Sequence, residues 1–177
     1  MKLKSIETFT TQDVGFVRIT AEDGSQGWGQ VSTYHADITV QVLHRQVAPW
    51  TLGKDTTDLD ALLDFVTDRE HKFPGSYLCR ALAGLDTAIW DWRGKDQGKP
   101  VAALLGGSAG PLRAYASSMK RDITPKDEAA RLKHLRDTQG FDAFKVRAGS
   151  EVGHDKDEWP GRTEEIIATM RREMGDG

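Results

Sequence analysis

The spacing of hydrophobic and polar positions changes twice along the 177-residue chain. The first thirty residues contain two β-prone runs, "KLKSIETF" and "VGFVRIT", and a shorter run, "QGWGQV". Asp23-Gly24, between the second and third runs, is a hairpin signal. The pattern predicts a small three-stranded antiparallel meander.

From about residue 37 to residue 98 the hydrophobic residues recur at helical spacing. Asp37 is the expected N-cap of the first helix. The clearest apolar stripe, with steps of four and three residues, consists of Leu78, Leu82, Leu85, Ile89 and Trp92. Small residues lie beside this stripe, among them Gly84, and would let another element approach closely. Cys79, on the same helix, is expected in the core.

A turn-rich connector, "LLGGSAGPL", marks a predicted domain boundary near residue 110. A short strand in "RAYASS" follows, and then a helix with Thr124 as N-cap and Pro125 in its first position. Gly140 ends that helix, the strand "FDAFKVRAG" comes next, and another helix begins at about Thr163. Strands that alternate with helices over short connections indicate the βα units of a parallel sheet.

In the strand "FDAFKVRAG", Lys145 and Arg147 alternate with Phe144 and Val146. Strands of parallel sheets are usually continuous hydrophobic runs, so two cations on one face are unusual. In a closed βα barrel these cations would point inward at the carboxyl end of the strand, where barrel active sites lie. They would then need an anionic partner, such as a substrate carboxylate or a carboxylate-ringed metal. The alternative is an edge strand with solvated charges that discourage aggregation.

The composition narrows the choice of partners and of compartment. Hydrophobic residues make up 38% of the chain and charged residues 29%, and the net charge is −3 with both signs interleaved. We therefore expect no nucleic-acid and no membrane partner. The single cysteine excludes an internal disulfide and favours a reducing compartment, so a cytoplasmic protein is expected.

The order of these elements resembles the enolase superfamily, most closely its mandelate racemase/muconate lactonizing enzyme branch. The likeness covers essentially the whole chain and is most specific in "RALAGLDTAIWDWRGKDQGKPVAALLGG", with the charged strand at the expected distance after it. It implies an α+β capping domain at residues 1–110 and the first two βα units of a modified TIM (β/α) barrel at residues 111–177. It also implies abstraction of the proton α to a carboxylate, with Mg²⁺ stabilising the enediolate.

The family usually has K-x-K at this strand, with the second lysine as the base. Here the second position is Arg147, which stays protonated in proteins and is better suited to clamp a carboxylate. Lys145 is then the one lysine of this strand that could move a proton. A His-Asp pair from the opposite side of the barrel, as relatives carry, is the alternative base.

In this family, loops of the capping domain select the substrate, and by position they are residues 10–13 and 32–37. Tyr34 and His35 are the candidates to hydrogen-bond a polyol or acid sugar, and capping or shielding of the following helix is their alternative role. Ser117, at the end of the first barrel strand, is a further substrate-binding candidate. A sugar-acid dehydratase is the favoured activity, and a racemase or a lactonizing cycloisomerase is the alternative.

A βα barrel needs eight strands and about 250 residues, and only two of its strands are expected here. The family's three metal-binding carboxylates come from the third to fifth strands, so Mg²⁺ is expected in the complete enzyme with ligands absent from this chain. The chain alone should be inactive. It is expected to be the N-terminal part of a larger, homo-oligomeric enzyme, whose remaining barrel is a continuation or a partner chain. A stand-alone cap that binds another protein and a non-catalytic α+β binding module are the alternatives.

Overall fold

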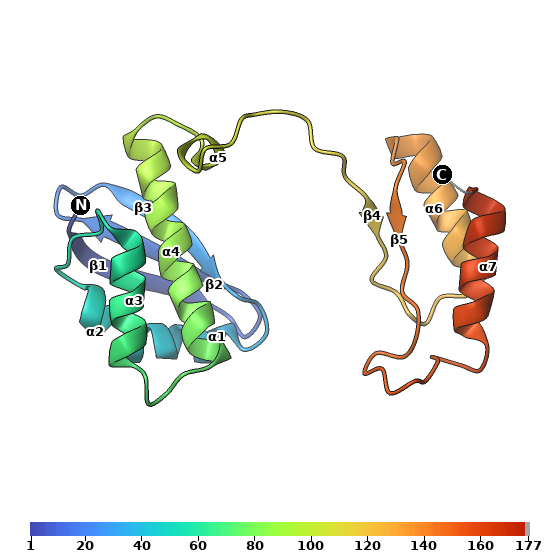
Figure 1. The fold of residues 1–177 in the computed structure, drawn as a ribbon, viewed down its shortest axis with the longest axis horizontal. Coiled ribbons are helices and arrows are strands. Elements are labelled where there is room, and N and C mark those ends of the chain that lie inside the picture. The colour runs from blue at the N-terminus through green and yellow to red at the C-terminus, as the bar shows by residue number, and fades with distance from the viewer. Residues whose placement is uncertain (176–177) are drawn as a thin grey trace. The chain divides into compact units, whose positions relative to one another are not determined.

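The computed structural model describes residues 1–175, which form two compact units, Met1–Ala109 and a second that begins at Gly110 (Figure 1). The first unit contains a three-stranded antiparallel sheet with helices, and the second contains a two-stranded parallel sheet with two helices. No helix among the described residues is long and apolar enough to cross a membrane.

The predicted meander is confirmed. Its strands follow in the order β1 (Leu3–Thr10), β2 (Gly15–Ala21) and β3 (Gln26–Val31). The hairpin between β2 and β3 turns at Gly24, whose φ of 88° suits glycine, and the Asp23 carboxylate accepts a hydrogen bond from the Ser25 amide at 2.9 Å.

The helices of the first unit are α1 (Ala36–Val42), a π-helical turn η1 (Leu43–Val47), α2 (Ala48–Thr51), α3 (Leu59–Arg69), α4 (Ser76–Asp96) and α5 (Val101–Leu104). The predicted helical stretch is confirmed, but the prediction of Asp37 as N-cap is wrong. His35 adopts a left-handed conformation and its carbonyl accepts the Thr39 amide at 3.0 Å, so the helix already begins at Ala36. Asp37 lies in the first turn, where its charge still favours the helix dipole.

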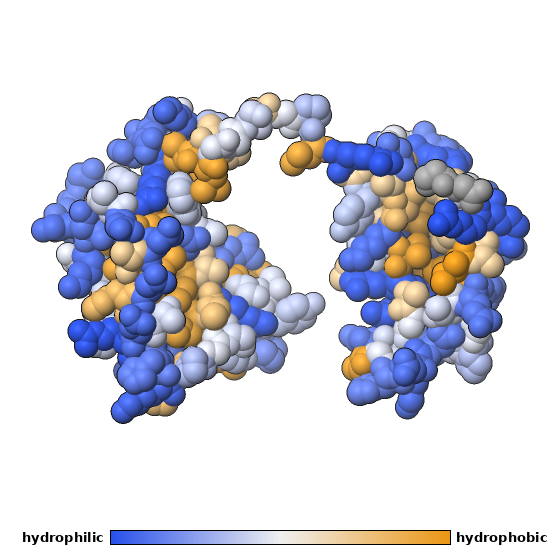
Figure 2. Space-filling model, viewed as in Figure 1, coloured by the Kyte–Doolittle hydropathy of each residue, from blue (hydrophilic) through white to orange (hydrophobic). Residues whose placement is uncertain are grey.

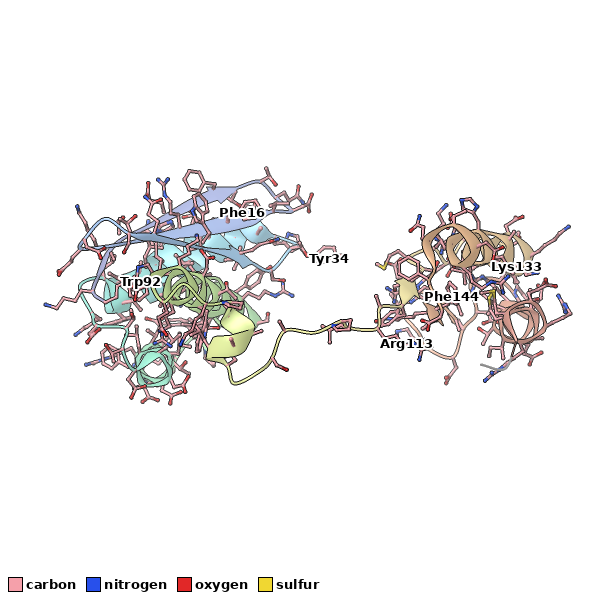
Figure 3. All side chains as sticks on the ribbon, turned by 90° about the horizontal axis from the view of Figure 1, so that it is seen from above. Phe16, Tyr34, Trp92, Arg113, Lys133 and Phe144 are labelled. Carbon is pink, nitrogen blue, oxygen red and sulfur yellow. The ribbon has the colours of Figure 1, made fainter. Side chains whose placement is uncertain are left out.

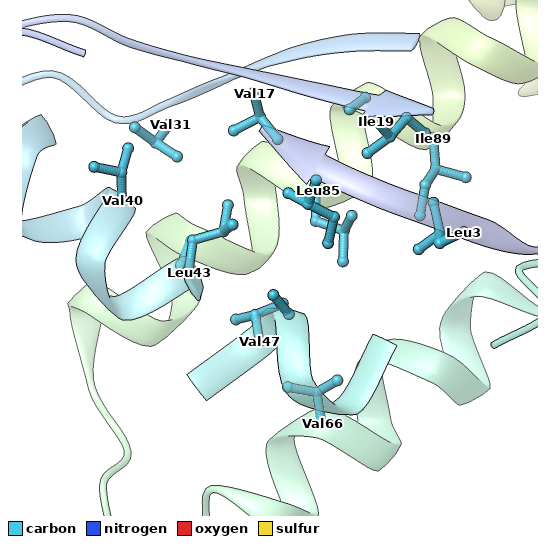
Figure 4. Packing of buried hydrophobic residues seen from close by; sticks show 14 of the residues in the cluster. Leu3, Val17, Ile19, Val31, Val40, Leu43, Val47, Val66, Leu85 and Ile89 are labelled. Atoms are coloured by element: carbon cyan, nitrogen blue, oxygen red, sulfur yellow. The ribbon is translucent and has the colours of Figure 1, made fainter. Parts of the chain in front are cut away.

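The core of the first unit lies between the sheet and the helices, and Figure 4 shows Val17 and Ile19 of β2 beside Leu85 and Ile89 of α4. These four side chains are fully buried. The close approach expected at the small residues of α4 is confirmed, because a Cβ built on Gly84 would lie 2.6 Å from a methyl group of Val31.

Cys79 is exposed, so its expected place in the core is wrong. It directly follows Leu78, whose side chain is buried. One residue further along a helix is a rotation of about 100°, which carries the thiol out of the apolar stripe.

The second unit consists of β4 (Ala116–Ser117), α6 (Pro125–Gln139), β5 (Phe144–Lys145) and α7 (Arg162–Met174). The two strands are parallel, and α6 and α7 lie side by side (Figure 1). The helix signals are confirmed: the Thr124 hydroxyl accepts the Asp127 amide at 3.1 Å, and Gly140 ends α6 with a φ of 73°. This is the predicted alternation of strand and helix, although each strand is only two residues long.

A substitution at Gly29 tests the close contact between β3 and α4. A Cβ at this position would lie 2.3 Å from the Gly84 carbonyl oxygen and 2.7 Å from the Ala88 nitrogen, both backbone atoms that cannot rotate away. We expect Gly29→Ala to lower the free energy of unfolding by about 1–3 kcal/mol. Urea unfolding followed by near-ultraviolet circular dichroism measures this change.

Gly110→Ala is the matched control, because a Cβ there would meet nothing within 4 Å. Its unfolding midpoint should equal that of the wild type. An unchanged midpoint for Gly29→Ala would contradict the close backbone packing.

Candidate functional site

The two candidate specificity loops lie at the same end of the first sheet. The strand register places Thr10, Gly15 and Val31 in one row, so the β1–β2 loop and the segment after β3 leave the sheet together. A hydrogen bond from the Ala36 amide to the Gln12 carbonyl, at 2.8 Å, joins the two loops directly. The structure therefore brings these segments into one surface.

Tyr34 and His35 carry unusual backbone strain within that surface. Their φ values are 61° and 58°, and left-handed geometry costs a non-glycine residue about 1–2 kcal/mol. The Tyr34 side chain is 70% exposed and stands at the margin of the unit in Figure 3. The His35 side chain is also exposed and makes no capping hydrogen bond to α1. Both rings are thus presented to solvent.

The two faces of β5 have opposite chemistry. Phe144 and Val146 line a cavity of about 440 Å³ together with Met170 and Met174 of α7. Figure 3 labels Phe144 in the second unit, and Figure 2 shows hydrophobic surface on that unit. Because side chains alternate along a strand, Lys145, which lies between Phe144 and Val146, projects to the other face.

Of the two catalytic candidates, Lys145 lies in β5 and Arg147 follows two residues after it. Lys145 is exposed, and Arg147 is half-buried with its Nη2 3.3 Å from the Met119 sulfur. Ser117, at the end of the neighbouring strand β4, is exposed and lies opposite Lys145 in the register. Lys145 and Ser117 are exposed, and this exposure suits the interior of a larger barrel as well as a solvated edge.

A buried polar network lies beside the two strands. Ser118, Glu128 and Arg162 are each 1% exposed, and Arg131 forms two hydrogen bonds of 2.9 Å to the Glu128 carboxylate. Burial raises the pKa of Glu128, but hydrogen bonds from Arg131 and Ser118 and the charges of Arg131 and Arg162 outweigh it, so the pKa lies below its usual value. The buried carboxylate is therefore ionised at neutral pH.

The ends of the two strands are held by guanidinium groups. Arg162 donates from Nη1 to the Arg147 carbonyl at 2.9 Å and from Nη2 to the Ile123 carbonyl at 3.3 Å. Arg121 donates to the Gly149 carbonyl at 2.7 Å. These contacts could not be predicted from the sequence, because Arg121 and Arg162 lie in polar stretches without periodicity.

Metal ligands are not gathered anywhere in residues 1–175: no three His, Cys, Asp or Glu side chains there are placed to hold an ion. The candidates of the second unit are the cations Lys145 and Arg147 and the hydroxyl of Ser117, and those of the first unit are the phenol of Tyr34 and the imidazole of His35. Such groups bind and orient an anion, which is the chemistry of carboxylate recognition.

A meander-and-helix domain followed by βα units, with two cations at a strand end, defines the class of the enolase superfamily. The chain belongs to the mandelate racemase / muconate lactonizing enzyme family, whose N-terminal domain matches residues 2–106.

Relatives match nearly the whole chain. A D-galactonate dehydratase family member from Paenibacillus sp. (strain JDR-2) is 30% identical over 86% of this chain and 38% of its own length. The crystal structure of a proposed racemase from Roseobacter denitrificans has a TM-score of 0.97 and 79% identity, over 99% of this chain and 48% of its own. A mandelate racemase/muconate lactonizing protein from Paracoccus denitrificans PD1222, complexed with magnesium, has a TM-score of 0.83 and 30% identity. The match covers 98% of this chain and 49% of that protein's chain. The chain thus spans less than half the length of these relatives.

Glu128→Gln tests the buried network. The substitution removes the charged acceptor of the two Arg131 hydrogen bonds, so we expect a loss of about 1–3 kcal/mol in the free energy of unfolding at pH 7. Because the native pKa of Glu128 is lowered, its contribution is present above the unfolded pKa and is lost as the pH falls through the native pKa. The difference between wild type and variant should therefore shrink in acid.

Urea unfolding followed by far-ultraviolet circular dichroism between pH 7 and pH 3 measures this difference. Glu158→Gln, at an exposed loop position in the same unit, is the control and should change little at any pH. A difference for Glu128→Gln that stays constant with pH would contradict the lowered pKa.

Proposed function

We propose that this chain is the N-terminal portion of a Mg²⁺-dependent enzyme that abstracts the α-proton of a carboxylate substrate, most specifically a sugar-acid dehydratase. In this proposal residues 1–110 form the capping domain and residues 111–177 form the first two βα units of the barrel. The observation that carries it is that Phe144 and Val146 line the cavity beside α7, whereas Lys145 of β5 and Arg147 just after it do not. The similarity to a D-galactonate dehydratase family member supports the choice of substrate class.

The proposed chemistry assigns different roles to the two cations. Arg147 binds the substrate carboxylate through its planar guanidinium and fixes the α-carbon in place. The side-chain amine of Lys145 takes the α-proton, and the electrons of the broken C–H bond form the enediolate. The β-hydroxyl then leaves as water by taking the proton back from the Lys145 ammonium. The resulting enol loses its O–H proton and gains a proton at C3, which gives a 2-keto-3-deoxy acid.

Mg²⁺ would supply the positive charge that makes the enediolate accessible. The described residues do not form a ligand cluster, so the ion would be held by the rest of the enzyme. The magnesium complex of the 30%-identical Paracoccus protein supports this cofactor.

The remaining assignments concern the surroundings of the site. Tyr34 and His35 bind the hydroxyl groups of the acid sugar from the capping domain, and Ser117 binds it from the end of β4. The partner is the remainder of the barrel, as a continuation of this chain or as a second chain, and the complete enzyme is a cytoplasmic homo-oligomer. Nucleic acid and membranes are not partners.

A racemase of the same superfamily is the second candidate, because the 79%-identical Roseobacter protein is described as a proposed racemase. A racemase returns a proton to the α-carbon and keeps every hydroxyl group, whereas a dehydratase releases water. A lactonizing cycloisomerase is the third candidate, and a stand-alone cap or binding module would show no turnover.

Lys145→Met in the full-length protein tests the base. Methionine keeps the length of the side chain but has no amine, so we expect kcat for sugar-acid dehydration to fall about 10²–10⁴-fold. Formation of the 2-keto-3-deoxy product from D-galactonate is the measurement, with added Mg²⁺ and with a chelator. Lys126→Met removes an exposed lysine of α6 and should keep wild-type activity. Full activity of Lys145→Met would exclude the lysine as the base.

Tyr34→Phe and His35→Asn test the specificity loop. The first removes only a hydroxyl group, and asparagine tolerates the left-handed backbone of position 35, so the loop should keep its shape. We expect each variant to raise KM for sugar acids by about 3–30-fold with a smaller change in kcat, as expected for one lost hydrogen bond. Steady-state kinetics on several sugar acids provides the comparison. Unchanged KM values for every substrate would contradict a role in binding.

A further inference from the structure

We propose that Arg162 is a positioning residue, which fixes the end of β5 so that Lys145 and Arg147 meet the substrate in one geometry. This inference rests on the proposed function. Arg162 itself touches neither substrate nor cofactor. It acts through the backbone of the segment that follows the two cations.

The burial of Arg162 is the first reason to assign it a dedicated role. Its side chain is 1% exposed, and taking a guanidinium out of water costs several kcal/mol unless partners compensate. One such partner is the ring of Trp159, whose centroid lies 5.0 Å from the guanidinium carbon, and two backbone carbonyls accept hydrogen bonds from the same group. Among the described residues none accepts a hydrogen bond from Arg162 Nε, so one buried donor of this group is unsatisfied.

The hydrogen bonds of Arg162 go to the carboxyl ends of both strands. One arm of the guanidinium binds the carbonyl of Arg147, the second catalytic candidate. The other arm binds the carbonyl of Ile123, in the connection that leaves β4. One rigid, planar group thus ties together two backbone segments, which a lysine with its single ammonium could not do in the same way.

Together with Arg121, Arg162 binds the backbone carbonyls of three successive residues, 147 to 149. Arg121 donates from Nη1 to the carbonyls of Ala148, at 3.1 Å, and of Gly149, at 2.7 Å. The Gly149 amide donates a hydrogen bond to the Thr163 hydroxyl at 3.0 Å. Thr163 is the residue that follows Arg162 in α7. These polar groups lie beyond the two-residue ladder of β5, so side chains replace the strand partners that would otherwise hold them.

The consequence for function follows from backbone geometry. The direction of the Arg147 side chain is set by its own backbone, and its carbonyl is the atom that Arg162 holds. A displacement of about 1 Å at such a position can cost about 100-fold in rate. Arg162 therefore controls kcat through position, without taking part in proton transfer.

Hydrogen exchange in the 177-residue chain tests the positional part without any need for activity. In Arg162→Met we expect the Gly149 amide to exchange at least about tenfold faster, because the segment loses its anchor, while the Leu132 amide in the core of α6 is unchanged. Arg162→Lys should be intermediate and provides a second variant if the methionine variant does not fold. Arg93→Met is the matched control, since Arg93 donates to the Thr56 carbonyl at 2.6 Å in the first unit; it should leave Gly149 unchanged. Unaltered Gly149 exchange, or equal acceleration at Leu132, would overturn the inference.

Kinetics of the full-length protein tests the functional part. We expect kcat to fall about 10–100-fold in Arg162→Met with a smaller change in KM, and to recover partly in Arg162→Lys. Wild-type kcat in a variant with accelerated Gly149 exchange would show a purely structural role and overturn the proposal. If the wild-type protein dehydrates no sugar acid, the proposed function fails, and the exchange comparison alone decides whether Arg162 positions the strand end.

Discussion

The alternation of side chains along β5 is the constraint on which the functional interpretation depends. Phe144 and Val146 face the apolar residues of α7, and burial of these side chains fixes which way the strand is turned. Lys145 and Arg147 are thereby directed to the opposite face, because a slip of one residue would bury both charges against the methionines of α7. The packing of the apolar side chains thus determines on which side of the strand the cations lie.

The two units are stabilised by different means. The first has a continuous apolar core, in which β3 and α4 approach so closely that glycine is required at the contact. The second has a small apolar core and contains buried charge beside the strands, where Glu128 forms an ion pair with Arg131 and Arg162 donates to backbone carbonyls. A polar network of this kind is sensitive to geometry, which suits a region that has to hold two cations in register.

Local signals explain how much of the fold could be predicted from the sequence. The Asp23-Gly24 turn, the Thr124 cap and the Gly140 terminus each act within a few residues, and each is confirmed. The start of α1 was predicted wrongly, because the left-handed backbone at His35 depends on the neighbouring loop rather than on its own sequence.

Only part of the candidate site could be predicted from the sequence. The charged pattern at residues 145 and 147 is visible in one strand, so it could be found without a structure. The partners of Arg162 lie 15 and 39 residues away in the sequence, and no periodicity connects them. Burial of a charged residue is a property of the folded environment, which explains why Glu128 and Arg162 were missed.

A crystal structure of the full-length protein with a bound sugar acid tests the central claim most directly. The predicted result is a substrate carboxylate on the Arg147 guanidinium and an α-carbon within about 3.5 Å of the Lys145 amine, both inside a closed barrel. The contradictory result is a Lys145 side chain on the outer, solvated surface, with the sugar acid bound elsewhere.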